Sequence, residues 1–166
     1  MLMETAAYLE RIEDLRAQIA KILQTVPQEA LNWRPDEETE SHEMNSLAVM
    51  ATHVAGAEHF WIGEVVGQLA ATRNRDAEFE MVVADTAVLL QKLEAVRSQT
   101  RTILQNLTQA DLDGVRPARD RQVTTRWAIL HVIDHTALHL GHMQMTAQLW
   151  QGGTAVDSPR WFQRLK

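Results

Sequence analysis

The sequence contains no cysteine. This absence excludes disulfides, metal sites built from thiolates, iron–sulfur clusters and a cysteine nucleophile. A metal bound by this chain must therefore have nitrogen and oxygen ligands. Any thiol chemistry must use a thiol that is supplied from solution.

Long apolar runs and an excess of basic residues are absent too. No apolar run approaches the ~20 residues of a membrane span, and the N-terminal residues lack the basic, apolar and small-residue regions of a secretory signal. The net charge of −6 argues against binding to nucleic acid or to an anionic membrane surface. We therefore expect a cytoplasmic protein whose partner is a small molecule rather than nucleic acid or a membrane.

The 166 residues are 45% hydrophobic and 23% charged, which is typical of a soluble globular protein. A chain of this length can bury one proper core but is too short for two domains of ordinary size. We expect a single domain over residues 1–166. Apolar residues spaced by three and four predict four helices, which cover residues 4–24, 46–69, 81–107 and 125–150.

Four helices of about 20 to 27 residues predict an all-α fold, a four-helix bundle. A long crossover, residues 25–45, joins the first and second helices and leaves their relative direction open. Residues 70–80 are predicted to be a polar turn and residues 108–123 a loop, and no segment alternates like a strand. Ser46 is the predicted N-cap of the second helix.

Four of the seven histidines lie in the fourth predicted helix. On a helical wheel they form one stripe about 80° wide. Their neighbours are apolar almost all round, as expected for a helix buried in a bundle. Because unpaired buried polar groups cost a few kcal/mol each, this stripe needs bound metal or hydrogen-bond partners. Its members are His131, His135, His139 and His142.

Two i,i+4 pairs on this helix, His131/His135 and His135/His139, have the spacing of metal ligands. The whole stripe spans about 16 Å, too far for one ion to contact every member. Spacing alone therefore leaves the choice of pair open, including the i,i+3 pair with His142. A third ligand must come from another helix, and His53 is the other histidine on a core-facing stripe; His59 lies about 240° from it on the wheel.

Two familiar metal motifs are excluded. The sequence has no His-Glu-x-x-His of zinc proteases, since His42-Glu43 is followed by no second histidine at the required position. No histidine follows a glutamate by three residues, as di-iron carboxylate bundles require. The remaining metal hypothesis is a mononuclear site with three imidazole ligands. The alternative is that these are core histidines whose ring nitrogens are satisfied by hydrogen bonds. His42 itself is expected to be a solvated loop residue.

The segment from His53 to Gly63 resembles the second helix of the DinB/YfiT-like metalloenzymes. The segment from Trp127 to His142 resembles their fourth helix, which reads roughly His-x-x-x-His-x-Gly-Gln. The resemblance implies a DinB-like bundle in which His53, His135 and His139 hold a divalent metal, usually Zn or Ni. His142 stands where the family often has glutamine. The resemblance further implies a homodimer, and some relatives are transferases or isomerases that use a low-molecular-weight thiol.

The leading functional hypothesis is therefore a metal-dependent enzyme, a thiol-dependent S-transferase or isomerase of small molecules. A metal-dependent hydrolase and a non-catalytic, metal-stabilised stress or interaction protein are the alternatives. Three ligands facing a pocket would favour catalysis, and a closed four-ligand site would favour a structural role. Asp134 and Glu64 are candidates for orienting an imidazole. We expect the 25–45 connection and the exposed end of the fourth helix to form the pocket walls.

Overall fold

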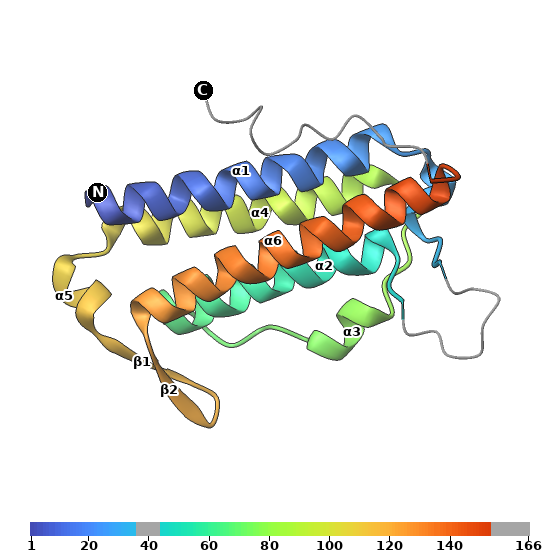
Figure 1. Ribbon diagram of the computed structural model, residues 1–166. Helices are drawn as coiled ribbons and strands as arrows, with labels where there is room; N and C mark the ends of the chain where they lie inside the picture. Colours follow the sequence, from blue (N-terminus) through green and yellow to red (C-terminus); the bar gives the residue numbers. More distant parts are fainter. Residues whose placement is uncertain (36–43, 154–166) are drawn as a thin grey trace.

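The computed structural model describes residues 1–35 and 44–153, in which four long helices dominate (Figure 1). Each of the four predicted helices is present, although the third starts at Thr86 rather than near residue 81. Ser46 accepts a hydrogen bond from the Val49 amide and so caps the second helix as predicted. The long helices are α1 (Met3–Thr25), α2 (Leu47–Glu58) with its π-helical continuation η2 (His59–Val66), α4 (Thr86–Asn106) and α6 (Thr125–Trp150).

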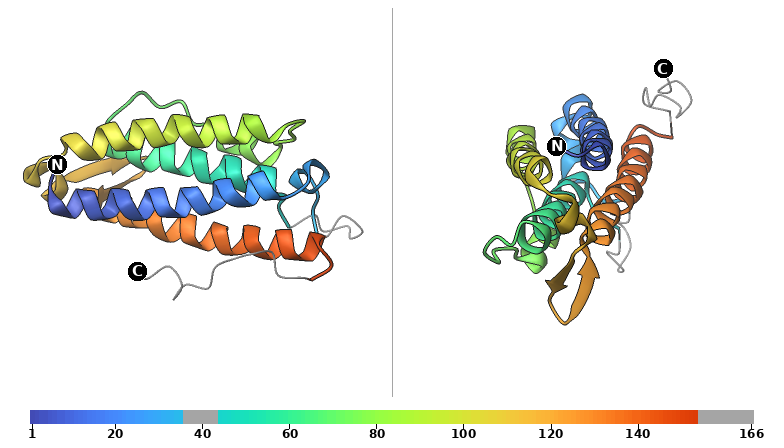
Figure 2. Two further views of the ribbon diagram at one scale, coloured as in Figure 1. Left: turned by 90° about the horizontal axis from the view of Figure 1, so that it is seen from above. Right: turned by 90° about the vertical axis from the view of Figure 1, so that its left-hand side faces the viewer.

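The four helices form a ring in which α1 contacts α4 and α6, and α2 contacts the same two helices. Helices α1 and α2 therefore lie on a diagonal of the bundle (Figure 2). They run in opposite directions, while α4 runs with α2 and α6 runs with α1 (Figure 1). The all-α bundle with its long α1–α2 crossover is confirmed. That crossover begins with the short 3-10 helix η1 (Gln28–Leu31).

The connection between α2 and α4 contains a helix that the sequence did not predict. Because α2 and α4 run in the same direction, residues 67–85 must return along the bundle (Figure 1). Within the predicted polar turn at 70–80 they form α3 (Arg75–Phe79), whose N-cap Asn74 accepts a hydrogen bond from the Ala77 amide. The prediction of a simple turn is wrong, since five helical residues are too few to show an apolar period.

The predicted loop at 108–123 is also partly ordered. It holds the short helix α5 (Gln109–Asp113), which begins with a capping box between Thr108 and Asp111. Strands β1 (Val115–Ala118) and β2 (Arg121–Thr124) then pair as an antiparallel hairpin. Strands of four residues are too short for alternation to stand out, which is why none was predicted.

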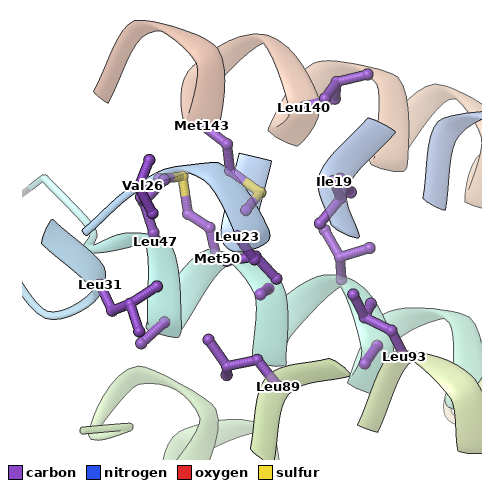
Figure 3. Packing of buried hydrophobic residues seen from close by; sticks show 14 of the residues in the cluster. Ile19, Leu23, Val26, Leu31, Leu47, Met50, Leu89, Leu93, Leu140 and Met143 are labelled. Carbon is purple, nitrogen blue, oxygen red and sulfur yellow. The ribbon is translucent and has the colours of Figure 1, made fainter. Parts of the chain in front are cut away.

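The core consists of two apolar clusters, one toward each end of the bundle. Figure 3 shows the first, where all four long helices contribute: Leu23, Leu47, Leu89 and Met143 are among its members. The second cluster has members from the same helices: Ile12, Ile62, Leu104 and Ile129. Burying each such side chain contributes about 1.5–3 kcal/mol. Three polar side chains lie between members of the two clusters on their helices: Glu58, Thr100 and His135.

Helix α6 is not buried all round, contrary to the expectation from its composition. Among the described residues it packs mainly on α1 and on α2 with its continuation η2, with smaller contacts to α5 and β2, and one side of it stays exposed. None of the described helices is long and apolar enough to cross a membrane. The side that faces outward carries large apolar residues that are 42–62% exposed: Trp127, Leu130, Leu138, Met145 and Leu149.

Candidate metal centre

Three imidazoles meet in the middle of the bundle. His53 comes from α2, and His135 and His139 come from successive turns of α6. Each offers one ring nitrogen, and these three nitrogens lie within 4.8 Å of one another. The Nε2 atoms of His53 and His135 are 3.1 Å apart. The structure thus brings together the three histidines that the sequence singled out.

The donor set suits a divalent metal that prefers nitrogen ligands. Nitrogens that share one zinc ion are roughly 3–3.5 Å apart, because each Zn–N bond is about 2.0–2.1 Å long. Small side-chain rotations would bring all three nitrogens to this separation. Burial, reinforced by the neighbouring imidazoles, lowers the pKa of His135 to about 3 and that of His139 to about 4. Both rings are therefore neutral at physiological pH, as metal ligation requires. Nδ1 of His139 is buried and has no hydrogen-bond partner among the described residues.

The orientation of His53 is fixed by a carboxylate from α3. Nδ1 of His53 lies 2.8 Å from Oε2 of Glu78. Burial alone would raise the pKa of Glu78, but hydrogen bonds from Arg73 and His53 lower it overall. The ionised carboxylate can only accept, so Nδ1 of His53 donates and Nε2 keeps a free lone pair toward the other two histidines. Arg73 donates two hydrogen bonds to the same carboxylate, from Nε to Oε1 at 2.7 Å and from Nη2 to Oε2 at 2.9 Å.

A glycine makes room for this carboxylate. Gly56 lies on α2 three residues after His53, and a Cβ atom placed there would come within 2.0 Å of Oε1 of Glu78. The role of Glu78 was not predicted from the sequence, because its five-residue helix is too short to show a repeat of apolar residues. Two local signals do point to it: an Asn74 cap that starts a helix, and a glycine one turn from a buried histidine.

Replacement of Gly56 by alanine is expected to weaken zinc binding without unfolding the protein. The new methyl group must displace the Glu78 carboxylate from His53, and loss of such an outer partner typically costs about 10–100-fold in metal affinity. Competition with a chromophoric chelator measures the zinc Kd. Gly141→Ala on α6 is the matched control, since a Cβ there meets nothing within 4 Å. An unchanged Kd in Gly56→Ala would contradict the role assigned to Glu78.

The other histidines have different surroundings. His131 stacks on Trp127, with ring centroids 4.9 Å apart and an interplanar angle of 5°. His142 is exposed. His59, the first residue of η2, forms a hydrogen bond through Nδ1 with Oε1 of Gln99 on α4 at 2.8 Å. His42 lies outside the described residues.

Neither carboxylate proposed from the sequence reaches the three imidazoles. Asp134 is exposed on α6. Oε1 of Glu64 accepts hydrogen bonds from the amides of Thr72 and Arg73 and lies 3.4 Å from Nε2 of His59. Glu64 belongs to the π-helical segment, where the 100° wheel used to place it no longer applies.

A cavity of about 240 Å³ opens beside the three-histidine cluster. His53 and His135 form part of its wall, and Phe60, Trp61 and His131 add an aromatic side. Residues of the hairpin turn and of the α2–α4 connection complete it. The described residues of the 25–45 connection do not line it, and residues 36–43 of that connection lie outside the described part of the chain; helix α6 contributes His131 and His135.

Comparisons with known proteins agree on the fold. A family model described as the DinB superfamily matches residues 11–143. A conserved protein from Enterococcus faecalis superposes with a TM-score of 0.75 at 16% identity, over 92% of this chain and 99% of that one. The DinB-like protein YjoA from Bacillus subtilis superposes with a TM-score of 0.69 at 17% identity, over 93% of this chain and 96% of that one.

A third similar structure is YfiT from Bacillus subtilis, described as a probable metal-dependent hydrolase with an unusual four-helix bundle topology. Its TM-score is 0.69 at 13% identity, over 93% of this chain and 91% of that one. At such low identities the likeness concerns the fold alone. Comparison with curated protein sequences gave no match.

Proposed function

The chain belongs to the DinB superfamily, and from this premise we propose that it is an enzyme that uses one divalent metal ion to act on a small molecule. His53, His135 and His139 would hold the ion. The observation that carries the proposal is the convergence of three imidazole nitrogens beside a cavity, which His53 and His135 line. Catalytic metal sites typically have three protein ligands and an open position, whereas structural sites are closed by four.

Zinc or nickel is the metal we propose, because a set of neutral imidazoles without thiolates suits both ions. The bound ion would supply positive charge that lowers the pKa of a small thiol or of water. The protein's own residues do the positioning. Glu78 holds the His53 ring in one tautomer, and Arg73 holds Glu78. Phe60 and Trp61 give one side of the cavity an aromatic wall.

The reaction we propose is transfer of a small thiol to an electrophile. The chain has no cysteine of its own, so the thiol must enter the cavity from solution. Hydrolysis is the second candidate, because the fold is shared with YfiT, which is described as a probable metal-dependent hydrolase. Homodimer formation is also part of the proposal, since a second copy would cover the exposed apolar side of α6; light scattering in solution tests it.

The decisive experiment begins with metal analysis of protein purified without chelators, where we expect close to one zinc or nickel ion per chain. Turnover is then measured with cysteine and 1-chloro-2,4-dinitrobenzene, where a sulfur–carbon bond forms and chloride leaves. Cleavage of 4-nitrophenyl acetate without thiol measures hydrolysis. Metal-dependent turnover only with thiol supports the transferase, and metal-dependent cleavage without thiol supports the hydrolase. Protein that carries no near-stoichiometric metal would refute the enzyme proposal.

A further inference from the structure

The cavity beside the three histidines is lined by arginines, although the chain as a whole has a net charge of −6. Asp120 is the one acidic residue among the described lining residues. A small cavity with one sign of charge on its wall concentrates the opposite sign from solution. The arginines of this wall are Arg73, Arg75, Arg119 and Arg121.

Two of these arginines have no carboxylate partner among the residues that the structure describes. The guanidinium of Arg75 lies over the Phe79 ring at 4.9 Å, and that of Arg119 lies over the Phe60 ring at 5.0 Å. An arginine stacked on an aromatic face is held in place while its N–H edge stays available for an acceptor. Arg73, by contrast, is engaged by Glu78.

The backbone at Arg119 supports a role for its side chain. Arg119 opens the two-residue turn between β1 and β2 and has a φ of 58°, in the left-handed region. Glycine adopts this conformation without a steric penalty, and hairpin turns usually place glycine, asparagine or aspartate there. An arginine at this position costs stability compared with glycine, so the turn alone does not account for it.

We propose that Arg75 and Arg119 bind an acidic group, a carboxylate or a phosphate, of the molecule that this cavity takes. The proposed enzyme would then act on a small organic acid, a conclusion that rests on the proposed function; the binding of anions does not. The cavity of about 240 Å³ is smaller than the ~300–1,000 Å³ of pockets for drug-sized ligands. Trp61 and His131 offer flat faces for the rest of the molecule.

Calorimetric titration of the metal-free protein with benzoate tests the proposal, with neutral benzamide as the shape-matched control and inorganic phosphate as a second anion. We expect benzoate to bind at least tenfold more tightly than benzamide, and salt to weaken it. Arg119→Gly and Arg75→Gln should each raise the benzoate Kd about tenfold, as loss of a hydrogen bond to a charged group predicts. Arg11→Gln, an exposed arginine on α1, should leave it within twofold. Arg119→Gly should keep or raise Tm, which separates lost binding from lost folding.

Phosphate binding that is tighter than benzoate binding, with the same dependence on Arg75 and Arg119, would support the proposal and identify the group as a phosphate. Equal binding of benzoate and benzamide, or no effect of either substitution, would overturn it. So would anion binding that requires zinc and ignores both arginines. Metal analysis of the wild-type protein stays a separate test of the proposed function, because the titration needs no metal.

Discussion

Replacement of His139 by alanine is expected to abolish stoichiometric zinc binding, while replacement of His131 leaves it intact. His139 offers one of the three converging nitrogens, so the variant would lose one of the three proposed ligands. Removing a hydrogen-bond partner of a ligand typically lowers metal affinity about 10–100-fold. The loss of zinc affinity in His139→Ala should be larger than that. His131 has the same i,i+4 relation to His135, but its ring is stacked on Trp127 and lies outside the cluster.

Metal analysis after dialysis, followed by chelator competition, measures the difference between the two variants. His142→Ala is a further control on the same helix, because His142 is exposed. Circular dichroism and Tm of the metal-free variants separate loss of the ligand from loss of the fold. Zinc retained by His139→Ala but lost by His131→Ala would show that the other histidine pair is the chelating one.

Replacement of Glu58 by alanine is expected to destabilise the protein by about 3–5 kcal/mol, the usual cost of leaving a buried charge without its partner. Glu58 on α2 and Arg16 on α1 form an ion pair across the diagonal of the bundle, with side chains only 1% and 5% exposed. Thr100 of α4 donates to the same carboxylate. Nε and Nη1 of Arg16 are buried without a hydrogen-bond partner among the described residues. The buried positive charge of Arg16 is therefore compensated by the Glu58 carboxylate.

Urea unfolding of the metal-free protein measures this free energy. The matched variant is Arg16→Met/Glu58→Leu, which removes both charges and keeps similar volume. Replacing a buried pair by apolar residues is often neutral or stabilising, so the double variant should recover most of the loss. A change below about 1 kcal/mol in Glu58→Ala would mean that water reaches Arg16 and that the pair is not buried in solution.

The long helices and the three histidines could be predicted because both depend on local periodicity. An apolar residue every three or four positions marks the buried side of α1, and the same period places His135 and His139 one turn apart. His53 followed by elimination, since few histidines lie on a predicted core-facing stripe. Family resemblance then singled out the pair, which helical spacing alone had left open.

The support of the site could not be predicted in the same way. Glu78 and Arg119 lie on a five-residue helix and on a two-residue turn, and neither segment is long enough to carry a period. Their positions depend on how the connections fold back over the bundle, which is a property of the three-dimensional arrangement. The apolar composition of α6 predicted burial on every side, but one apolar side of this helix is exposed among the described residues.

The parallel course of α2 and α4 has a consequence for how such a protein can diversify. The three histidines lie on the long helices α2 and α6, whereas half of the residues that line the cavity come from the α2–α4 connection and from the hairpin before α6. Loops and turns tolerate substitutions that helices in a packed core do not. With the roles proposed above, changes in Arg75 or in the Arg119 turn would alter which molecule is accepted, while the proposed metal ligands and the core stay as they are. Selectivity and reactivity would then be separable by mutation, which makes the hairpin the natural segment to randomise when a new substrate is sought.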